Sequence, residues 1–185
     1  MKICFFAFIL LALPSLSVLA GGPQVWSVNT RAEAEAAVRA TRYPPQGERG
    51  IGGSRTRLYG GGDYVQHANE EILLIAEIEH RDGVANAEAI LSTPGIDAYF
   101  IGPGDLCASL GLPHTWDPDF PEYWSALERV RSAGKATGVP GGIHTSATGV
   151  SKMLGLGYQF IALGFDISFL AQGAAGVLDA ARAKR

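Results

Sequence analysis

Short apolar segments alternate with helix-like segments along most of this 185-residue chain. The apolar segments are continuous runs, which is typical of parallel strands covered on both faces. The expected strands cover residues 25–28, 72–79, 98–101, 137–143 and 160–163. This alternation predicts an α/β fold with a parallel sheet, either an open doubly wound sheet or part of a (β/α)8 barrel. In both, functional residues lie at the carboxyl ends of the strands.

Start and stop signals set the expected helices. Thr30-Arg-Ala-Glu33 has the spacing of a capping box, so a helix is expected from there to about Ala40. Gly134 is expected to end a helix over residues 121–133. The other expected helices cover residues 63–69, 82–91, 146–154 and 172–184.

Composition limits the classes of partner. The hydrophobic content of 47% is enough for one domain with its own core. The net charge is −3 and no basic stripe occurs, so no nucleic-acid partner is expected.

The N-terminus is a different kind of sequence. Lys2 precedes a long apolar run that ends in Val18 and Ala20, small residues at the −3 and −1 positions of a signal-peptide cleavage site. We expect a signal-peptide-like leader over residues 1–20 and one domain over residues 21–185. The leader predicts a secreted or periplasmic protein, and the alternative is a buried or spurious N-terminal extension.

Two acidic residues follow neighbouring expected strands. Glu79 ends the strand of residues 72–79, and Asp105 follows the strand of residues 98–101. Adjacent parallel strands would bring both carboxylates to the same edge of the sheet, where two hard oxygen ligands suit a divalent metal. The alternatives are that Glu79 pairs with an arginine and that Asp105 caps the next helix.

Further polar residues are expected at this edge. Glu77 lies two residues before Glu79, so both side chains point to the same side, and Glu77 either lines the pocket or pairs with an arginine. Gly104 belongs to a Gly-Pro-Gly turn whose N–H groups can bind an anion. His144 ends the weaker fourth strand and is either a pocket residue or a loop histidine.

Lysine positions exclude one mechanism. The four lysines lie in the leader, on expected helices or at helix ends, and none lies on an expected strand where a Schiff-base lysine would be needed. Carbonyl chemistry in this chain would therefore need a metal.

Several segments resemble the HpcH/HpaI aldolase family. The resemblance is carried by Arg42-Tyr-Pro-Pro-Gln-Gly-Glu-Arg-Gly50, Glu77-Ile-Glu79, Pro94-Gly-Ile-Asp-Ala-Tyr-Phe-Ile-Gly-Pro-Gly-Asp-Leu106 and Ser109-Leu-Gly111. It implies a metal-dependent pyruvate aldolase, such as a 4-hydroxy-2-oxoheptanedioate or 2-dehydro-3-deoxyglucarate aldolase. It also implies a (β/α)8-type barrel, a homo-oligomer and, as the alternative to export, a cytoplasmic location.

The resemblance also implies residue roles. Glu79 and Asp105 would hold Mg²⁺, Mn²⁺ or Co²⁺, and the N–H groups of Gly104 and Asp105 would bind the carboxylate of a 2-oxo acid. The metal would stabilise the enolate that forms when the carbon–carbon bond breaks. Glu77 and His144 remain as candidate catalytic residues of the pocket.

The chain departs from the family pattern at its N-terminal side. The family's barrel begins with three further βα units, which carry an arginine for the keto oxygen and an Asp–His pair for acid–base work. Here Gly21-Gly22-Pro23 leads directly into the equivalent of the fourth strand. The expected fold is therefore a partial (β/α)8 barrel of about five parallel strands. Glu77 stands where the family usually has Gln.

The expected function is that of a metal-dependent carbon–carbon lyase that cleaves 4-hydroxy-2-oxo acids to pyruvate and an aldehyde. The alternatives are a non-catalytic exported fragment or binding module that keeps affinity for the metal and the 2-oxo acid, and an incomplete gene model. A small 2-oxo acid is the expected partner, and a homo-oligomer is expected if the barrel is completed.

Overall fold

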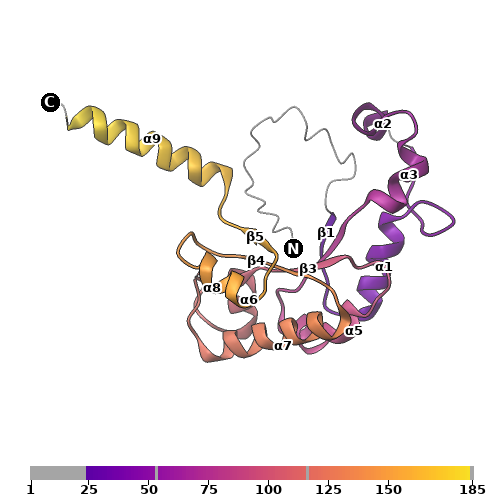
Figure 1. The fold of residues 1–185 in the computed structure, drawn as a ribbon, viewed down its shortest axis with the longest axis horizontal. Coiled ribbons are helices and arrows are strands. Elements are labelled where there is room, and N and C mark those ends of the chain that lie inside the picture. Colours follow the sequence, from indigo (N-terminus) through magenta and orange to yellow (C-terminus); the bar gives the residue numbers. More distant parts are fainter. Residues whose placement is uncertain (1–23, 53, 116, 184–185) are drawn as a thin grey trace.

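One parallel sheet organises the molecule. A computed structural model of the chain describes residues 24–52, 54–115 and 117–183. Within these residues, five parallel strands form a sheet in the order β1-β2-β3-β4-β5 (Figure 1). They are β1 (Gln24–Ser27), β2 (Leu74–Glu77), β3 (Ala98–Ile101), β4 (Gly141–His144) and β5 (Phe160–Ala162). The described sheet is open, with β1 and β5 as its edges.

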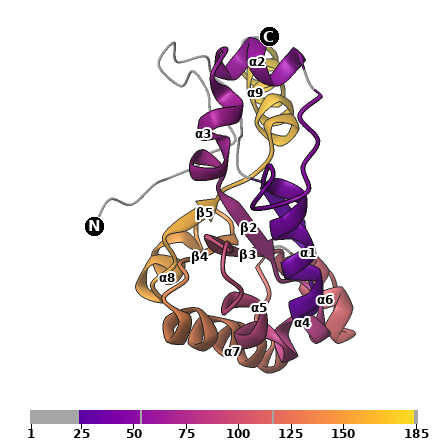
Figure 2. The same cartoon turned by 90° about the vertical axis from the view of Figure 1, so that its right-hand side faces the viewer.

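The helices that connect the strands indicate which α/β architecture this is. They are α1 (Arg31–Thr41), α2 (Ser54–Gly60), α3 (Tyr64–Glu71), α4 (Arg81–Ala85), α5 (Ala87–Leu91), α6 (Pro103–Leu110), α7 (Pro121–Thr137), α8 (Val150–Gly155) and α9 (Asp166–Arg182). Figures 1 and 2 show α1, α5, α6 and α7 on one side of the sheet. Sequential strand order with helices on one face is the arrangement of a barrel segment, whereas a doubly wound sheet has helices on both faces. The α/β fold with five parallel strands is confirmed.

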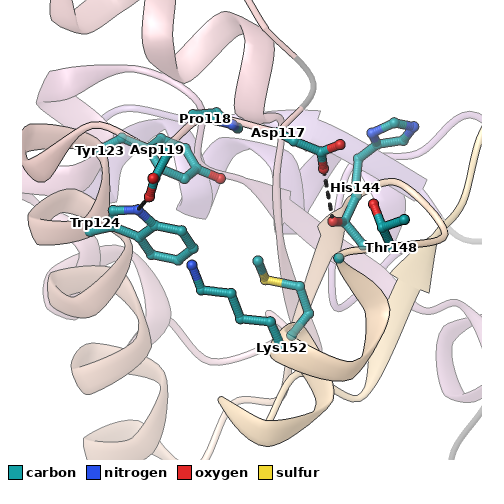
Figure 3. Close-up of a pocket in the computed structure, with 11 residues that line it drawn as sticks. Asp117, Pro118, Asp119, Tyr123, Trp124, His144, Thr148 and Lys152 are labelled. Carbon is teal, nitrogen blue, oxygen red and sulfur yellow. Dashed lines mark hydrogen bonds between the residues drawn. The ribbon is translucent and has the colours of Figure 1, made fainter.

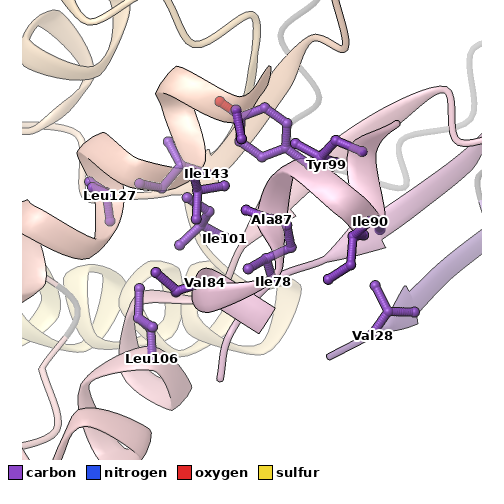
Figure 4. Packing of buried hydrophobic residues seen from close by; sticks show 14 of the residues in the cluster. Val28, Ile78, Val84, Ala87, Ile90, Tyr99, Ile101, Leu106, Leu127 and Ile143 are labelled. Carbon is purple, nitrogen blue, oxygen red and sulfur yellow. The ribbon is translucent and has the colours of Figure 1, made fainter. Parts of the chain in front are cut away.

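The core lies between the helices and one face of the sheet. Ile78, Ile101 and Ile143 project from β2, β3 and β4 or their ends toward this side, where Leu127 of α7 packs with them (Figure 4). All four side chains are buried. Because successive side chains of a strand point to opposite faces, the residues between them project away from the helices.

This second face of the sheet carries the residues that matter for function. The pairing register aligns Glu77 of β2 with Phe100 of β3, and Phe100 with Gly142 of β4. His144 lies two residues after Gly142, so its side chain projects from the same face as that of Glu77. It is two residues closer to the carboxyl end of its strand than the position aligned with Glu77.

The expected capping box is present at the start of α1. The Thr30 hydroxyl accepts a hydrogen bond from the Glu33 N–H at 3.2 Å, and the Glu33 carboxylate accepts one from the Thr30 N–H at 3.1 Å. Two N–H groups that the helix leaves without intrahelical partners are satisfied in this way.

The predicted end of α7 is wrong. The helix continues through Gly134 to Thr137 and ends at Gly138, whose φ of 76° is left-handed. A Cβ on Gly134 would overlap the ring of Tyr99, so this glycine serves close packing of the helix on the sheet. Because α7 extends to Thr137, β4 begins only at Gly141, later than the expected residue 137.

Other boundaries also differ from the predictions. The expected helix over residues 82–91 is two short helices joined at Asn86, whose side-chain amide donates to the Asn29 carbonyl at 2.8 Å. Helices α2 and α6 were not predicted. The Gly102-Pro103-Gly104 segment predicts a turn, but Pro103 instead opens α6, since proline is favoured in the first turn of a helix. Helix α8 begins later, and α9 earlier, than expected.

The predicted leader over residues 1–20 lies outside the described residues. Among the residues that the structure describes, no helix is both long enough and apolar enough to cross a membrane.

Candidate active site

A cavity of about 490 Å³ opens at the carboxyl ends of β2–β5. It is lined by Glu77, Phe100, Gly102, Pro103, Gly104, Asp105, His144, Ala162, Gly164, Phe165 and Asp166. Four of the five predicted site residues, Glu77, Gly104, Asp105 and His144, therefore line one cavity. Parallel strands place their carboxyl ends at one edge, which explains why residues far apart in sequence meet here.

The fifth predicted residue, Glu79, lies beside this cavity at Gly102. A Cβ added to Gly102 would lie 3.0 Å from Oε2 of Glu79 and 3.6 Å from Oδ2 of Asp105. The two carboxylate oxygens are therefore no further apart than the sum of these two lengths. The structure therefore places both predicted carboxylates next to Gly102.

The alternative explanations for this pair find no support in the described part of the chain. There, neither Glu79 nor Asp105 forms an ion pair with a lysine or arginine. Gly102, not Asp105, occupies the N-cap position of α6, and Asp105 lies in the first turn. A carboxylate in the first turn is favoured by the helix dipole.

The negative charges of Glu79 and Asp105 affect the protonation of Glu77. Its pKa is raised from 4.5 to about 7, chiefly by burial, then by the charge of Glu79 and of Asp105. Glu77 and Glu79 are partly buried and Asp105 is exposed. A divalent cation would relieve the repulsion among the three carboxylates. Among the described residues, no group of three or more His, Cys, Asp or Glu side chains is arranged to hold a metal ion. A metal here would depend on the Glu79–Asp105 pair together with ligands from outside the protein.

Gly104 lies in the buried first turn of α6. A Cβ at this position would lie 2.6 Å from Nε2 of His114, so the close approach of this imidazole requires glycine. The first N–H groups of a helix have no intrahelical acceptor and attract anions. Those of Gly104 and Asp105 belong to this turn at the wall of the cavity.

His144 is the last residue of β4, and its imidazole stacks on Phe165 with ring centroids 5.4 Å apart and an interplanar angle of 24°. Burial lowers the pKa of His144 below 6.5, and the negative charge of Asp117 opposes this shift. The imidazole is therefore mostly neutral at pH 7, the form that can accept a proton. Phe165 was not predicted; its place after Gly164, directly beyond β5, is the sequence signal that could have identified it.

A second, smaller cavity of about 260 Å³ lies on the other side of the end of β4 (Figure 3). Its wall includes the indole of Trp124, whose N–H donates to Asp119 at 3.0 Å, while the Lys152 ammonium lies 3.6 Å from the ring centre. The imidazole of His144 points away from Trp124 and Lys152 (Figure 3). This cavity could not be predicted from the sequence, because its residues come from two separate stretches, 117–124 and 144–153.

Comparison with known proteins identifies relatives of this chain. A model of the HpcH/HpaI aldolase/citrate lyase family matches residues 15–172. The hydroxypyruvate/pyruvate aldolase of Chromohalobacter salexigens is 44% identical over 154 residues, which are 80% of this chain and 59% of that protein. The 4-hydroxy-2-oxo-heptane-1,7-dioate aldolase of Klebsiella pneumoniae is 40% identical over 154 residues, which are 80% of this chain and 56% of that protein.

Solved structures show the same relationship. The crystal structure of an HpcH/HpaI aldolase/citrate lyase family protein from Burkholderia cenocepacia has a TM-score of 0.75 and 36% identity, covering 86% of this chain and 65% of that chain. The crystal structure of the HpcH/HpaI aldolase from Desulfitobacterium hafniense has a TM-score of 0.74 and 29% identity. The match covers 86% of this chain and 63% of that chain. The chain spans less than two thirds of the length of each of these relatives. On this evidence, the chain belongs to the HpcH/HpaI aldolase/citrate lyase family.

Proposed function

We propose that this chain binds a 2-oxo acid and a divalent metal at the cavity and cleaves 4-hydroxy-2-oxo acids reversibly to pyruvate and an aldehyde. The observation that carries this proposal is the convergence of Glu79 and Asp105 on Gly102, beside the cavity. Relatives named as pyruvate and 4-hydroxy-2-oxo-acid aldolases support the substrate class.

The donor set fits a hard divalent cation such as Mg²⁺, Mn²⁺ or Co²⁺. Mg²⁺ takes oxygen ligands, often only one or two carboxylates from the protein, and keeps several waters. Glu79 and Asp105 would hold such an ion, which when bound supplies Lewis-acid stabilisation of negative charge on an oxygen of the substrate. Glu77 adds further negative charge close by.

The residues of the chain would provide binding, a dry environment and a proton acceptor. The first-turn N–H groups of Gly104 and Asp105 would bind the carboxylate of the 2-oxo acid. Phe100 and Phe165 line the cavity with apolar surface that limits access of water. The neutral imidazole of His144, which lines the same cavity, could accept the proton that the substrate hydroxyl loses when the bond to the aldehyde carbon breaks.

The activity test is pyruvate release. Purified protein is incubated with Mn²⁺ and 4-hydroxy-2-oxo acids, and pyruvate is coupled to oxidation of NADH. We expect pyruvate from the wild type, none above background from Glu79→Ala, and wild-type rates from Asp119→Ala, which removes a carboxylate outside this cavity. A folded sample that binds Mn²⁺ but releases no pyruvate would instead identify a non-catalytic binding module.

The homo-oligomer that the family resemblance implies is also part of the proposal. Helix α9 has no buried residue, and four of its large apolar side chains, Ile167, Leu170, Val177 and Leu178, are 54–71% exposed. Spacings of three, seven and one residues place them along one stripe of the helix. An apolar stripe of this kind is the surface that a second copy of the chain would cover.

A further inference from the structure

Residues 111–115 and 117–120 are the described part of the connection between α6 and α7, and they contact two elements that border the main cavity. At one side, the imidazole of His114 packs against Gly104 in the first turn of α6. At the other side, Asp117 contacts the segment that directly follows His144. One loop therefore touches both the proposed carboxylate-binding turn and the strand end that carries the histidine.

The contact of Asp117 is specific. Its Oδ1 accepts a hydrogen bond from the Ser146 N–H at 3.2 Å and another from the Thr145 hydroxyl at 3.4 Å. The Thr145 side chain is 2% exposed, so its hydroxyl needs a partner inside the protein. Asp117 supplies that partner and also holds the backbone N–H of Ser146, two residues after His144.

The other side of His144 is fixed by different groups. Its ring stacks on Phe165 in the main cavity. Glu77 of β2, Asp105 of α6 and Asp166 of α9 are the titratable groups that line the cavity with it. Asp117, Asp119, Tyr123 and Lys152 are the titratable groups that line the smaller cavity, which His144 also borders.

We propose that Asp117 is a positioning residue for His144, because it holds the Thr145–Ser146 backbone and so sets the imidazole against Phe165 at the wall of the cavity. This inference rests on the proposed function for its purpose, since a fixed imidazole matters only if His144 handles a proton. Asp117 also places a negative charge near the ring, which favours the imidazolium that proton uptake would create.

The test is the NMR titration of the histidine side chains in the full chain, with the His144 signals assigned from His144→Gln. In the wild type, the ring current of Phe165 should shift the carbon-bound imidazole protons of His144 away from ordinary histidine positions. Asp117→Ala should reduce that displacement and lower the pKa of His144, because the negative charge that favours the imidazolium is lost.

Two variants separate charge from position. Asp117→Asn keeps an acceptor oxygen without the charge, so it should lower the pKa of His144 and keep most of the ring-current displacement. Asp119→Asn is the matched control, because this neighbouring carboxylate bonds to Trp124 and not to the segment after His144. It should leave both quantities unchanged.

Unchanged His144 signals in both Asp117 variants would overturn the inference, as would an equal effect of Asp119→Asn. If Asp117→Ala does not fold, Asp117→Asn still decides the charge effect, and Thr145→Val tests the hydrogen bond from the other partner. The readout needs no catalysis. Absence of pyruvate release would therefore contradict the proposed function and leave this inference standing on its own result.

Discussion

The carboxylates of Glu79 and Asp105 converge on Gly102, although α4, α5 and β3 separate the two residues along the chain. Gly102 is the N-cap of α6, and any side chain there would enter the space beside Glu79 Oε2. Glycine at this position keeps the two oxygens accessible to a common ligand.

Gly102→Ala should weaken metal binding. Its Cβ would lie 3.0 Å from Glu79 Oε2, closer than ordinary van der Waals contact, so the carboxylate must move. We expect Mn²⁺ affinity to fall roughly 10-fold or more, as when a ligand's supporting contacts are lost. Electron paramagnetic resonance of free Mn²⁺ measures this. The control is Gly155→Ala, where no atom lies within 4 Å of the added Cβ; equal affinities for the two variants would refute the prediction.

Glu77→Gln should change the pH dependence of stability in metal-free protein. The folded state keeps the Glu77 proton up to about pH 7, whereas the unfolded state loses it near 4.5. The folded state therefore binds more protons between these values, and stability falls as pH rises through this window. The variant should be more stable by about 1 kcal/mol at pH 8, after discounting for partial exposure, and equal at pH 4. Urea unfolding with EDTA at both pH values measures this. The same difference in unfolding free energy between variant and wild type at pH 4 and pH 8 would contradict the prediction.

His144→Gln should have the opposite pH signature. The pKa of His144 is lowered in the folded state, so the unfolded state binds more protons as pH falls below 6.5. The wild type should therefore lose stability relative to His144→Gln between pH 7 and pH 5. Thermal unfolding at the two pH values measures the difference. A constant gap between the two proteins would show that the imidazole is not held neutral by burial.

Gly134→Ala should destabilise the fold although alanine is the better helix former. The added methyl would overlap the ring of Tyr99 and lie 3.0 Å from the Val139 carbonyl oxygen. Overpacking of this kind costs about 1–3 kcal/mol. Chemical unfolding should show this loss for Gly134→Ala but none for Gly155→Ala, where the new methyl meets open space. A neutral or stabilising effect at Gly134 would mean that the helix and sheet separate easily here.

Leu170→Glu should disrupt self-association through α9. Leu170 is 69% exposed in the middle of the apolar stripe, and a charge there would be costly to bury against a second copy. Light scattering coupled to size exclusion should give a lower mass for the variant than for the wild type, with Gln172→Glu, on the same helix but off the stripe, as control. A wild type that is already monomeric would remove the proposed role of α9.

The sequence predicted the five strands and the capping box of α1 because both depend on local patterns. It misjudged Gly134 because the same residue type that ends helices also allows close packing, and only the position of Tyr99 distinguishes the two uses. It missed α6 because Pro103 marks both turns and helix starts.

In the candidate site, too, some features could be predicted from local sequence patterns and others depend on tertiary contacts. Adjacent strands were enough to predict that Glu79 and Asp105 approach each other, since parallel strands end at one edge. The stacking of Phe165 on His144 and the bonds of Asp117 to Thr145 and Ser146 depend on loop paths that no periodicity encodes. The roles of Glu77, Glu79, Gly104, Asp105 and His144 remain predictions.

Mn²⁺ binding to the folded chain tests the central claim most directly. The account predicts one Mn²⁺ per chain in the wild type, loss of that ion in both Glu79→Ala and Asp105→Ala, and full retention in Asp119→Ala. Wild-type binding in either of the first two variants, with the fold verified by circular dichroism, would contradict the shared-cation site on which the proposed chemistry depends.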